Sequence, residues 1–267
     1  MRALLAGLAI LLLLDVPPVF AADPLVEARR LYNAGDYTAA ARHAREALAL
    51  HAAAASARLV LGRSCLEIYR QTADQADLTE ARNALKGIDA ETLDWRERAE
   101  LSIGFAQTLF FEDRFGSASE MFERVLDVSL DLGRPAHERV LDWWATALDR
   151  LALSRPVAAR EALYERIVRR MEPELSADPS SAPAAYWLAA ALRGSGNLER
   201  AWHAAAAGWV SAGLGRDRGA ALRADIDRLV TRGIIPDRAA RLQPKDPQPA
   251  GAVMLAEWEA FKTAWTR

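Results

Sequence analysis

The sequence contains a single cysteine, Cys65, and almost no net charge. One cysteine excludes an internal disulfide, so packing must hold the 267-residue chain together. The 34 lysines and arginines against 36 aspartates and glutamates give a formal net charge of −2. Binding nucleic acid through a basic surface requires a marked positive excess. We therefore expect no nucleic-acid partner, and we expect Cys65 to act as a small buried hydrophobe.

Motifs that carry catalysis or bind metals are also missing. The sequence has no GxSxG elbow, no P-loop and no CxxC pair, and Gly213, Gly215 and Gly219 do not have the spacing of a nucleotide-binding loop. No histidine has a second histidine, a cysteine or a glutamate at a metal-ligand spacing. We expect all four to lie partly exposed on helices: His43, His51, His137 and His203. The sequence therefore predicts no catalytic residue, no metal site and no cofactor, although Asp142 and Asp149 could form a carboxylate pair across helices.

The one long apolar run lies at the N-terminus. Arg2 precedes twelve apolar residues, Ala3 to Leu14, and Val19-Phe20-Ala21 has a small-residue cleavage pattern. Such a run makes a helix of about 18 Å, which is shorter than the roughly 30 Å hydrocarbon core of a bilayer. We expect residues 1–21 to be a signal peptide cleaved after Ala21, with an uncleaved membrane anchor as the alternative. No cysteine follows the run to carry a lipid, so we expect a periplasmic or secreted product without an integral membrane segment.

The rest of the chain carries a repeated helical pattern, and no alternating β-branched run indicates a strand. Residues 25–48 place Ala28 on one helix, a Gly35-Asp36-Tyr37 turn after it, and Ala40 on the next helix. Small residues let two antiparallel helices approach closely, and glycine tolerates the positive φ of the turn. The second-helix alanines are 41, 37, 41 and 42 residues apart: Ala40, Ala81, Ala118, Ala159 and Ala201.

These turns and alanines resemble the tetratricopeptide repeat. The resemblance is specific in residues 25–48, 105–126 and 188–209 and degenerate in the two units between them. It implies an all-α fold, a right-handed superhelical solenoid of about five helix pairs over residues 22–212. Residues 213–267 would form a C-terminal extension of capping helices with a Pro-rich linker, residues 236–250. A spacing near 40 residues exceeds the usual 34 and approaches that of HEAT and armadillo repeats, which implies longer helices or loops.

Local signals mark where helices begin and end. Asp94, with Glu97 three residues later, has the pattern of a capping box. Gly133-Arg134-Pro135 predicts the end of one helix and the start of the next. Both signals agree with a chain that is helical throughout.

The last helix, expected over Ala252 to Trp265, carries an aromatic stripe. Leu255, Trp258 and Trp265 fall on one face, together with Phe261 or Lys262. Such a stripe favours packing on the chain itself, where it would cap the apolar end of a solenoid. The alternative is a tethered helix that docks in a groove of a partner.

The resemblance also implies where a partner would bind. In tetratricopeptide proteins the first helices of successive pairs line a concave groove, and arginine and aromatic side chains suit a bound peptide. The corresponding positions here are Arg29, Tyr32, Asn33, Arg63, Gln107, Phe110, Asp142, Thr146, Tyr186 and Arg193. Phe110 could instead belong to the core. Arg29, Asn33 and Arg63 faintly resemble a clamp for a C-terminal carboxylate, but the lysines of such clamps are absent.

We therefore expect a non-catalytic scaffold of the cell envelope that binds a protein or an extended peptide on the concave face. One alternative is a subunit of an envelope assembly or secretion machine that docks through the C-terminal aromatic helix. Another is an enzyme or small-ligand binder with a pocket inside the superhelix. All three rest on analogy with the family, because a fold alone does not specify a function.

Overall fold

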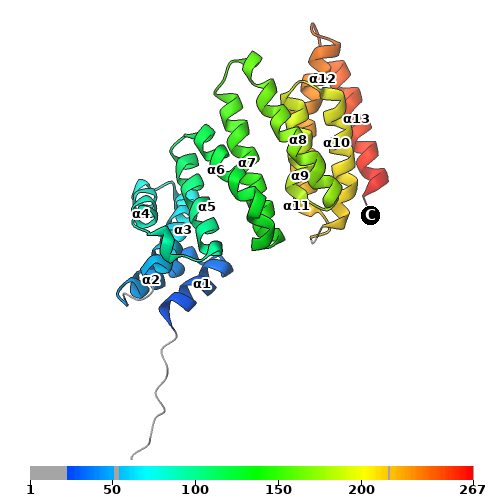
Figure 1. The fold of residues 1–267 in the computed structure, drawn as a ribbon. Coiled ribbons are helices and arrows are strands. Elements are labelled where there is room, and N and C mark those ends of the chain that lie inside the picture. The colour runs from blue at the N-terminus through cyan, green and yellow to red at the C-terminus, as the bar shows by residue number, and fades with distance from the viewer. Residues whose placement is uncertain (1–22, 51–53, 216, 267) are drawn as a thin grey trace, which may run out of the picture.

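The computed structural model describes residues 23–50, 54–215 and 217–266. The expected signal peptide and its cleavage site lie outside these residues. Every regular element of the described residues is a helix, as the sequence predicts (Figure 1). The α-helices are α1 Pro24–Ala34, α2 Tyr37–Leu48, α3 Ala54–Thr72, α4 Gln75–Lys86, α5 Trp95–Phe111, α6 Phe115–Ser129, α7 Arg134–Leu153, α8 Glu161–Ala177, α9 Ala182–Gly194, α10 Leu198–Ser211, α11 Ala220–Leu229, α12 Ile235–Leu242 and α13 Gln248–Trp265.

From α1 to α11 the helices are arranged in two layers. The odd-numbered helices α1, α3, α5, α7, α9 and α11 contact one another in succession and form one layer, which we call the odd layer. Each even-numbered helix from α2 to α10 packs on the odd helix before it and on the odd helix after it. The chain thus runs steadily from one end of the stack to the other, with α13 covering the far end (Figure 1). This arrangement places one face of every odd helix on a common surface.

Alanine and glycine at the crossings bring the helices close together. Ala28, Ala40 and Ala81 are fully buried, as are Ala118 and Ala201. A Cβ atom on Gly62 of α3 would lie 2.6 Å from Cγ of Leu85 on α4. At that distance the α3 and α4 backbones could not pack as they do, because interiors are already close-packed. Small residues at the crossings therefore set the distance between neighbouring helices.

The fourth repeat departs from this pattern. Ala159 does not occupy a helix crossing: it is exposed, in a short 3-10 turn, Val157–Ala159, that precedes α8. In α6 and α10 a buried alanine lies three residues after the first residue of the helix. In α8 the same position is occupied by the buried Tyr164. A Cβ atom on Gly194 of α9 would lie 2.6 Å from the Tyr164 ring, so glycine there makes room for the large side chain. A tyrosine thus lies at this crossing where an alanine was expected, and the glycine on the facing helix leaves space for its ring.

Three predicted helix boundaries are confirmed, whereas the last helix begins at Gln248 and not at Ala252. Gly35 ends α1 with a φ of 83°, a left-handed conformation that favours glycine. The Asp94 carboxylate accepts a hydrogen bond from the Glu97 backbone N–H at 2.8 Å, and the Glu97 carboxylate accepts from the Asp94 N–H in return, which completes the capping box. Gly133 separates a 3-10 turn from α7, which begins at Arg134.

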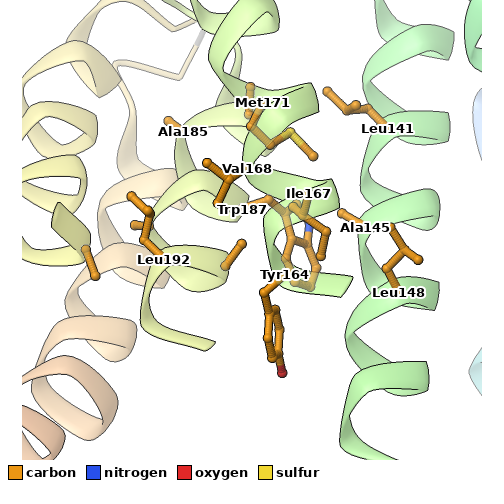
Figure 2. Close-up of a cluster of buried hydrophobic side chains, with 14 of the residues drawn as sticks. Leu141, Ala145, Leu148, Tyr164, Ile167, Val168, Met171, Ala185, Trp187 and Leu192 are labelled. Atoms are coloured by element: carbon orange, nitrogen blue, oxygen red, sulfur yellow. The ribbon is translucent and has the colours of Figure 1, made fainter. Parts of the chain in front are cut away.

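Two hydrophobic clusters form the core. One joins α1 to the first half of α5 and contains Cys65, which is fully buried as expected. Burial raises the pKa of that thiol to about 12. The other cluster continues from α5 to α13, and Figure 2 shows its part between α7, α8 and α9. There Ile167, Met171 and Trp187 meet Leu141 and Leu148 of α7.

The C-terminal region is more helical than the sequence indicates. Residues 236–250 do not form a linker: Pro236 lies in the first turn of α12 and Pro249 in the first turn of α13. Proline is tolerated there because the first turn of a helix does not use its N–H groups. Only residues 243–247 between the two helices are non-helical. A π-helical turn, Val230–Ile234, joins α11 to α12.

Helix α13 packs on the chain itself. Trp258 is fully buried, its ring meets those of Trp202 and Trp209 on α10, and its indole N–H donates to Asp227 at 2.9 Å. The buried stripe combines Trp258 with Met254, and Leu255, which was expected on that face, is exposed. No helix of the described part of the chain is both long and apolar enough to cross a membrane.

We expect Trp258→Ala to lower the free energy of unfolding by about 3–5 kcal/mol, because it leaves a cavity beside the α10 tryptophans and removes the indole hydrogen bond to Asp227, which keeps only its bond from Lys262. Trp265→Ala, in the same helix but 53% exposed, is the matched control and should change it little. Urea unfolding followed by circular dichroism measures both. Equal effects of the two substitutions would contradict the packing described for α13.

Candidate functional site

The odd layer contains a cleft of about 550 Å³ between α1, α3, α5 and α7. Six of the ten residues predicted from the sequence line it, and they come from all four helices. They are Arg29, Tyr32, Asn33, Arg63, Gln107 and Asp142. Residues separated by more than a hundred positions in the sequence are therefore brought to one site.

The other four predicted residues lie elsewhere and have partners within the chain. Phe110 makes edge-to-face contacts with Phe115 and Trp143, so its role is packing between α5, α6 and α7. Thr146 donates to the backbone carbonyl of Asp142, four residues earlier. Tyr186 meets the ring of Trp187, and Arg193 donates to Asp237 at 2.7 Å. None of the four lines the cleft.

Arg63 is the central side chain of the cleft and is held on three sides. Its guanidinium lies 4.9 Å from the centre of the Tyr32 ring and pairs with Glu100 at 2.9 Å. Its stem lies against Gly104, where an added Cβ would be 3.8 Å from Arg63 Cγ. Burial alone would lower the pKa of Arg63, but Tyr32 and Glu100 outweigh it and the pKa is raised. Arg63 is therefore a fixed positive charge.

Two polar atoms in the cleft lack a hydrogen-bond partner in the described residues. They are Nε of Arg63, whose side chain is 12% exposed, and Oε1 of Gln107, a residue that is 3% exposed. Gln107 follows Gly104 by three residues, so it lies one helical turn beyond the point where Arg63 crosses α5. A buried polar group without a partner costs about 1–3 kcal/mol. Both atoms are themselves buried from solvent.

Two of the remaining arginines of the cleft form ion pairs with glutamates, and two do not. Arg29 pairs with Glu97, and Arg70 with Glu67. Arg96 lies over the ring of Trp95 at 4.8 Å, and neither Arg96 nor Arg139 forms an ion pair within the described residues. Both are exposed at the cleft. The cleft thus offers two cationic groups to a ligand.

The prediction from the sequence missed several cleft residues, although the signal was present. Arg139 precedes the predicted Asp142 by three residues and Trp143 follows it by one, so all three lie near one face of α7. On α5, Arg96 and Glu100 share the face of Gln107 by the same helical spacing. Extending the pattern by one turn along α7, and by two and three turns along α5, would have found them.

Two carboxylates of the odd layer are bonded to neutral partners: Asp142, which lines the cleft, and Asp149, which does not. Trp187 donates its indole N–H to Asp142 at 2.7 Å, and the Tyr164 hydroxyl donates to Asp149 at 3.0 Å. Desolvation raises the pKa of both carboxyl groups, and these hydrogen bonds oppose it. Asp142 and Asp149 do not form a carboxylate pair of their own in the bonds described.

His137 is not a partly exposed helical histidine, contrary to expectation. It is 3% exposed, its Nδ1 lies 2.7 Å from the Ser129 hydroxyl, and its Nε2 lies 2.9 Å from Glu174. The Ser-His-Glu order resembles a hydrolase triad, but Ser129 is fully buried, so a substrate cannot reach its hydroxyl in this conformation. The three residues instead join α6, α7 and α8. His43 and His203 are partly or fully exposed, and His51 lies outside the described residues.

Within residues 23–50, 54–215 and 217–266, no group of three or more histidine, cysteine, aspartate or glutamate side chains could hold a metal ion. Charged, hydrogen-bonding and aromatic side chains line the cleft. Two stability measurements test how these groups are held.

We expect Gln107→Met to raise the free energy of unfolding by about 1 kcal/mol, because methionine keeps the unbranched shape and removes the unpaired oxygen. Gln71→Met, at an exposed position near the end of α3, is the control for the amide-to-thioether change. Thermal and urea unfolding measure both. A destabilised Gln107→Met protein would show that the amide is satisfied.

We expect Asp149→Asn to stabilise the protein at neutral pH. The raised pKa means that the folded state binds this proton more tightly than the unfolded chain does, so ionisation with rising pH removes stability. Asparagine still accepts the Tyr164 hydrogen bond and never ionises. The gain in melting temperature should shrink as the pH falls towards the ordinary aspartate value of 3.8. A gain that is independent of pH would contradict this cause.

Comparisons with known proteins give no match. No protein-family model matches this chain, no curated protein matches its sequence, and no solved structure matches its fold. The resemblance to tetratricopeptide repeats therefore rests on the chain's own turns and small residues. Any function assigned to it rests on the geometry of the cleft.

Proposed function

We propose that this chain is an exported, non-catalytic binding protein whose tetratricopeptide-like solenoid of about five helix pairs holds an extended peptide segment of a partner. The cleft between α1, α3, α5 and α7 carries this proposal. Its position on the odd layer corresponds to the groove that the family uses. Export rests on the N-terminal sequence pattern alone.

The size and lining of the cleft support a peptide ligand. Its volume of about 550 Å³ is sufficient for a few residues of extended chain. The lining combines tyrosine and tryptophan rings with arginine and glutamine side chains. Rings provide rigid apolar contact, while arginine and amide groups bind backbone and carboxylate oxygens.

The lining balances five arginines with five carboxylates, but two of the arginines are exposed and favour a segment that contains acidic residues. Three of its arginines are neutralised by glutamates, namely Arg29, Arg63 and Arg70. Arg96 and Arg139 are left without an ion pair in the described residues and are exposed. A glutamate or aspartate of the ligand would form an ion pair with either arginine. Such exposed charges also speed the association of two partners.

Packing at the C-terminus argues against docking through the aromatic face of α13. Trp258 is fully buried against α10 and is bonded to Asp227. Its aromatic neighbour Phe261 is stacked on it. Exposing this face would uncover the tryptophans of α10, so the helix serves the chain's own stability.

The proposal is tested by selecting binders from a display library of random linear peptides against the chain from residue 22 onward. We expect the selected peptides to be enriched in acidic residues. The double substitution Arg96→Glu and Arg139→Glu should lower their affinity at least about tenfold, because it turns two attractions into repulsions. Isothermal titration calorimetry measures this.

Arg124→Glu is the matched control, because Arg124 is exposed on α6, a helix that contributes none of the described residues lining the cleft. It should leave the affinity unchanged. Failure to select any binder, or binders that are insensitive to the cleft substitutions, would overturn the proposal.

A further inference from the structure

The connection between α7 and α8 exposes an apolar and basic stretch at one edge of the helix stack (Figure 1). Residues 153–159 are all exposed, and five of these seven are apolar. Val157, at 76%, is the most exposed large hydrophobic side chain of the described residues, and Leu153 is 52% exposed. A single exposed apolar residue is ordinary, but a run of them indicates a surface that contacts something other than water.

The stretch is held in place by its own hydrogen bonds. The Ser154 hydroxyl donates to the Leu151 carbonyl at 2.7 Å, and Arg160 donates its Nε–H to the Arg155 carbonyl at 2.9 Å. The Arg160 backbone N–H also donates to the Val157 carbonyl at 3.1 Å. The apolar side chains are therefore exposed because the chain is folded in this way.

Three arginines accompany the apolar residues: Arg150, Arg155 and Arg160. None of them forms an ion pair within the described residues, and residues 150–160 contain no acidic side chain. Of the two carboxylates that flank this range, Asp149 accepts the Tyr164 hydroxyl, and Glu161 is exposed at the start of α8. The whole chain has a net charge of −2, so the positive charge here is local.

The size of this surface favours a lipid membrane over a protein partner. A stable protein interface takes about 800 Å² and roughly 20–30 residues from each partner. Residues 150–160 are far fewer, and they lie at a turn and not in a groove. A membrane surface needs only a few apolar side chains that enter the headgroup region, beside basic residues that attract anionic lipids.

We propose that the α7–α8 connection binds the surface of an anionic lipid membrane. Leu153 and Val157 enter the headgroup region, and the arginines lie against the lipid phosphates. The cleft residues of α7 fall within residues 136–143, in the first half of this 20-residue helix, whereas the connection follows its last turn. Membrane binding therefore leaves the cleft open to a ligand, and the inference does not depend on the proposed function.

The charges are tested by cosedimentation of the chain from residue 22 onward, which contains every described residue, with lipid vesicles. We expect it to bind vesicles of phosphatidylglycerol and phosphatidylcholine, but not of phosphatidylcholine alone, and to be released by high salt. Arg150→Glu combined with Arg155→Glu should lower the affinity at least about thirtyfold, because two attractions become repulsions. Arg98→Glu combined with Arg124→Glu is the matched control, at two exposed arginines outside the connection, and should change the affinity less than about threefold.

The apolar contribution is tested by Leu153→Ser combined with Val157→Ser. This variant should lower the affinity for the same anionic vesicles about tenfold, because binding scales with the apolar area that enters the membrane. Leu242→Ser combined with Val253→Ser, at residues that are 65% and 70% exposed on α12 and α13, is the matched control and should have little effect. Melting temperatures confirm that each variant is folded.

Two results would rule out this inference. One is a wild-type chain that does not bind anionic vesicles, or whose binding falls equally in the control variants. The other is vesicle binding that the Leu153 and Val157 substitutions leave unchanged, with equally tight binding of polyglutamate, which would assign the surface to an acidic polypeptide. Neither result bears on peptide selection, because none of the described residues that line the cleft belongs to the connection.

Discussion

Close contact between helices through alanine and glycine is the constraint on which this structure depends. Buried alanines at the crossings, such as Ala28 and Ala40, let each helix settle on its neighbour with little side-chain volume between them. Gly62 shows how small the tolerance is, because even one added carbon would overlap Leu85. These contacts fix the spacing of the odd layer, and the cleft between α1 and α7 has its shape because that spacing is fixed.

The same constraint produces the site. Gly104 on α5 leaves space for the stem of Arg63, which crosses from α3 and reaches Glu100 and Tyr32. A Cβ atom at Gly104 would lie 3.0 Å from Leu85 Cδ1 of α4 and 3.8 Å from Arg63 Cγ of α3. Helix packing and the placement of the polar groups are thus linked, because the same small residue faces the core and the stem of Arg63.

Sequence reasoning succeeded where the determinants are local. Gly35, the Asp94 capping box and the helical spacing of Arg29 and Tyr32 depend on residues within one or two turns. It failed where a residue is accommodated by a distant one. The helix crossing predicted for Ala159 is occupied by Tyr164, because Gly194, thirty positions further on, leaves space for its ring. His137 is buried because Glu174 of another helix bonds to it. Such pairings follow from the fold and not from periodicity.

The polar groups of the cleft are in conflict with stability, and this conflict is informative. An apolar residue at Gln107 would fill the same space without an unpaired oxygen, and selection for stability alone would favour it. Cores in which each local feature agrees with the fold are the norm, and departures concentrate at functional sites. In this chain six buried side-chain atoms lack a hydrogen-bond partner in the described residues, and two of them, Arg63 Nε and Gln107 Oε1, belong to residues that line the cleft. The groups that a ligand could reach are the exposed Arg96 and Arg139, which have no ion pair in the described residues.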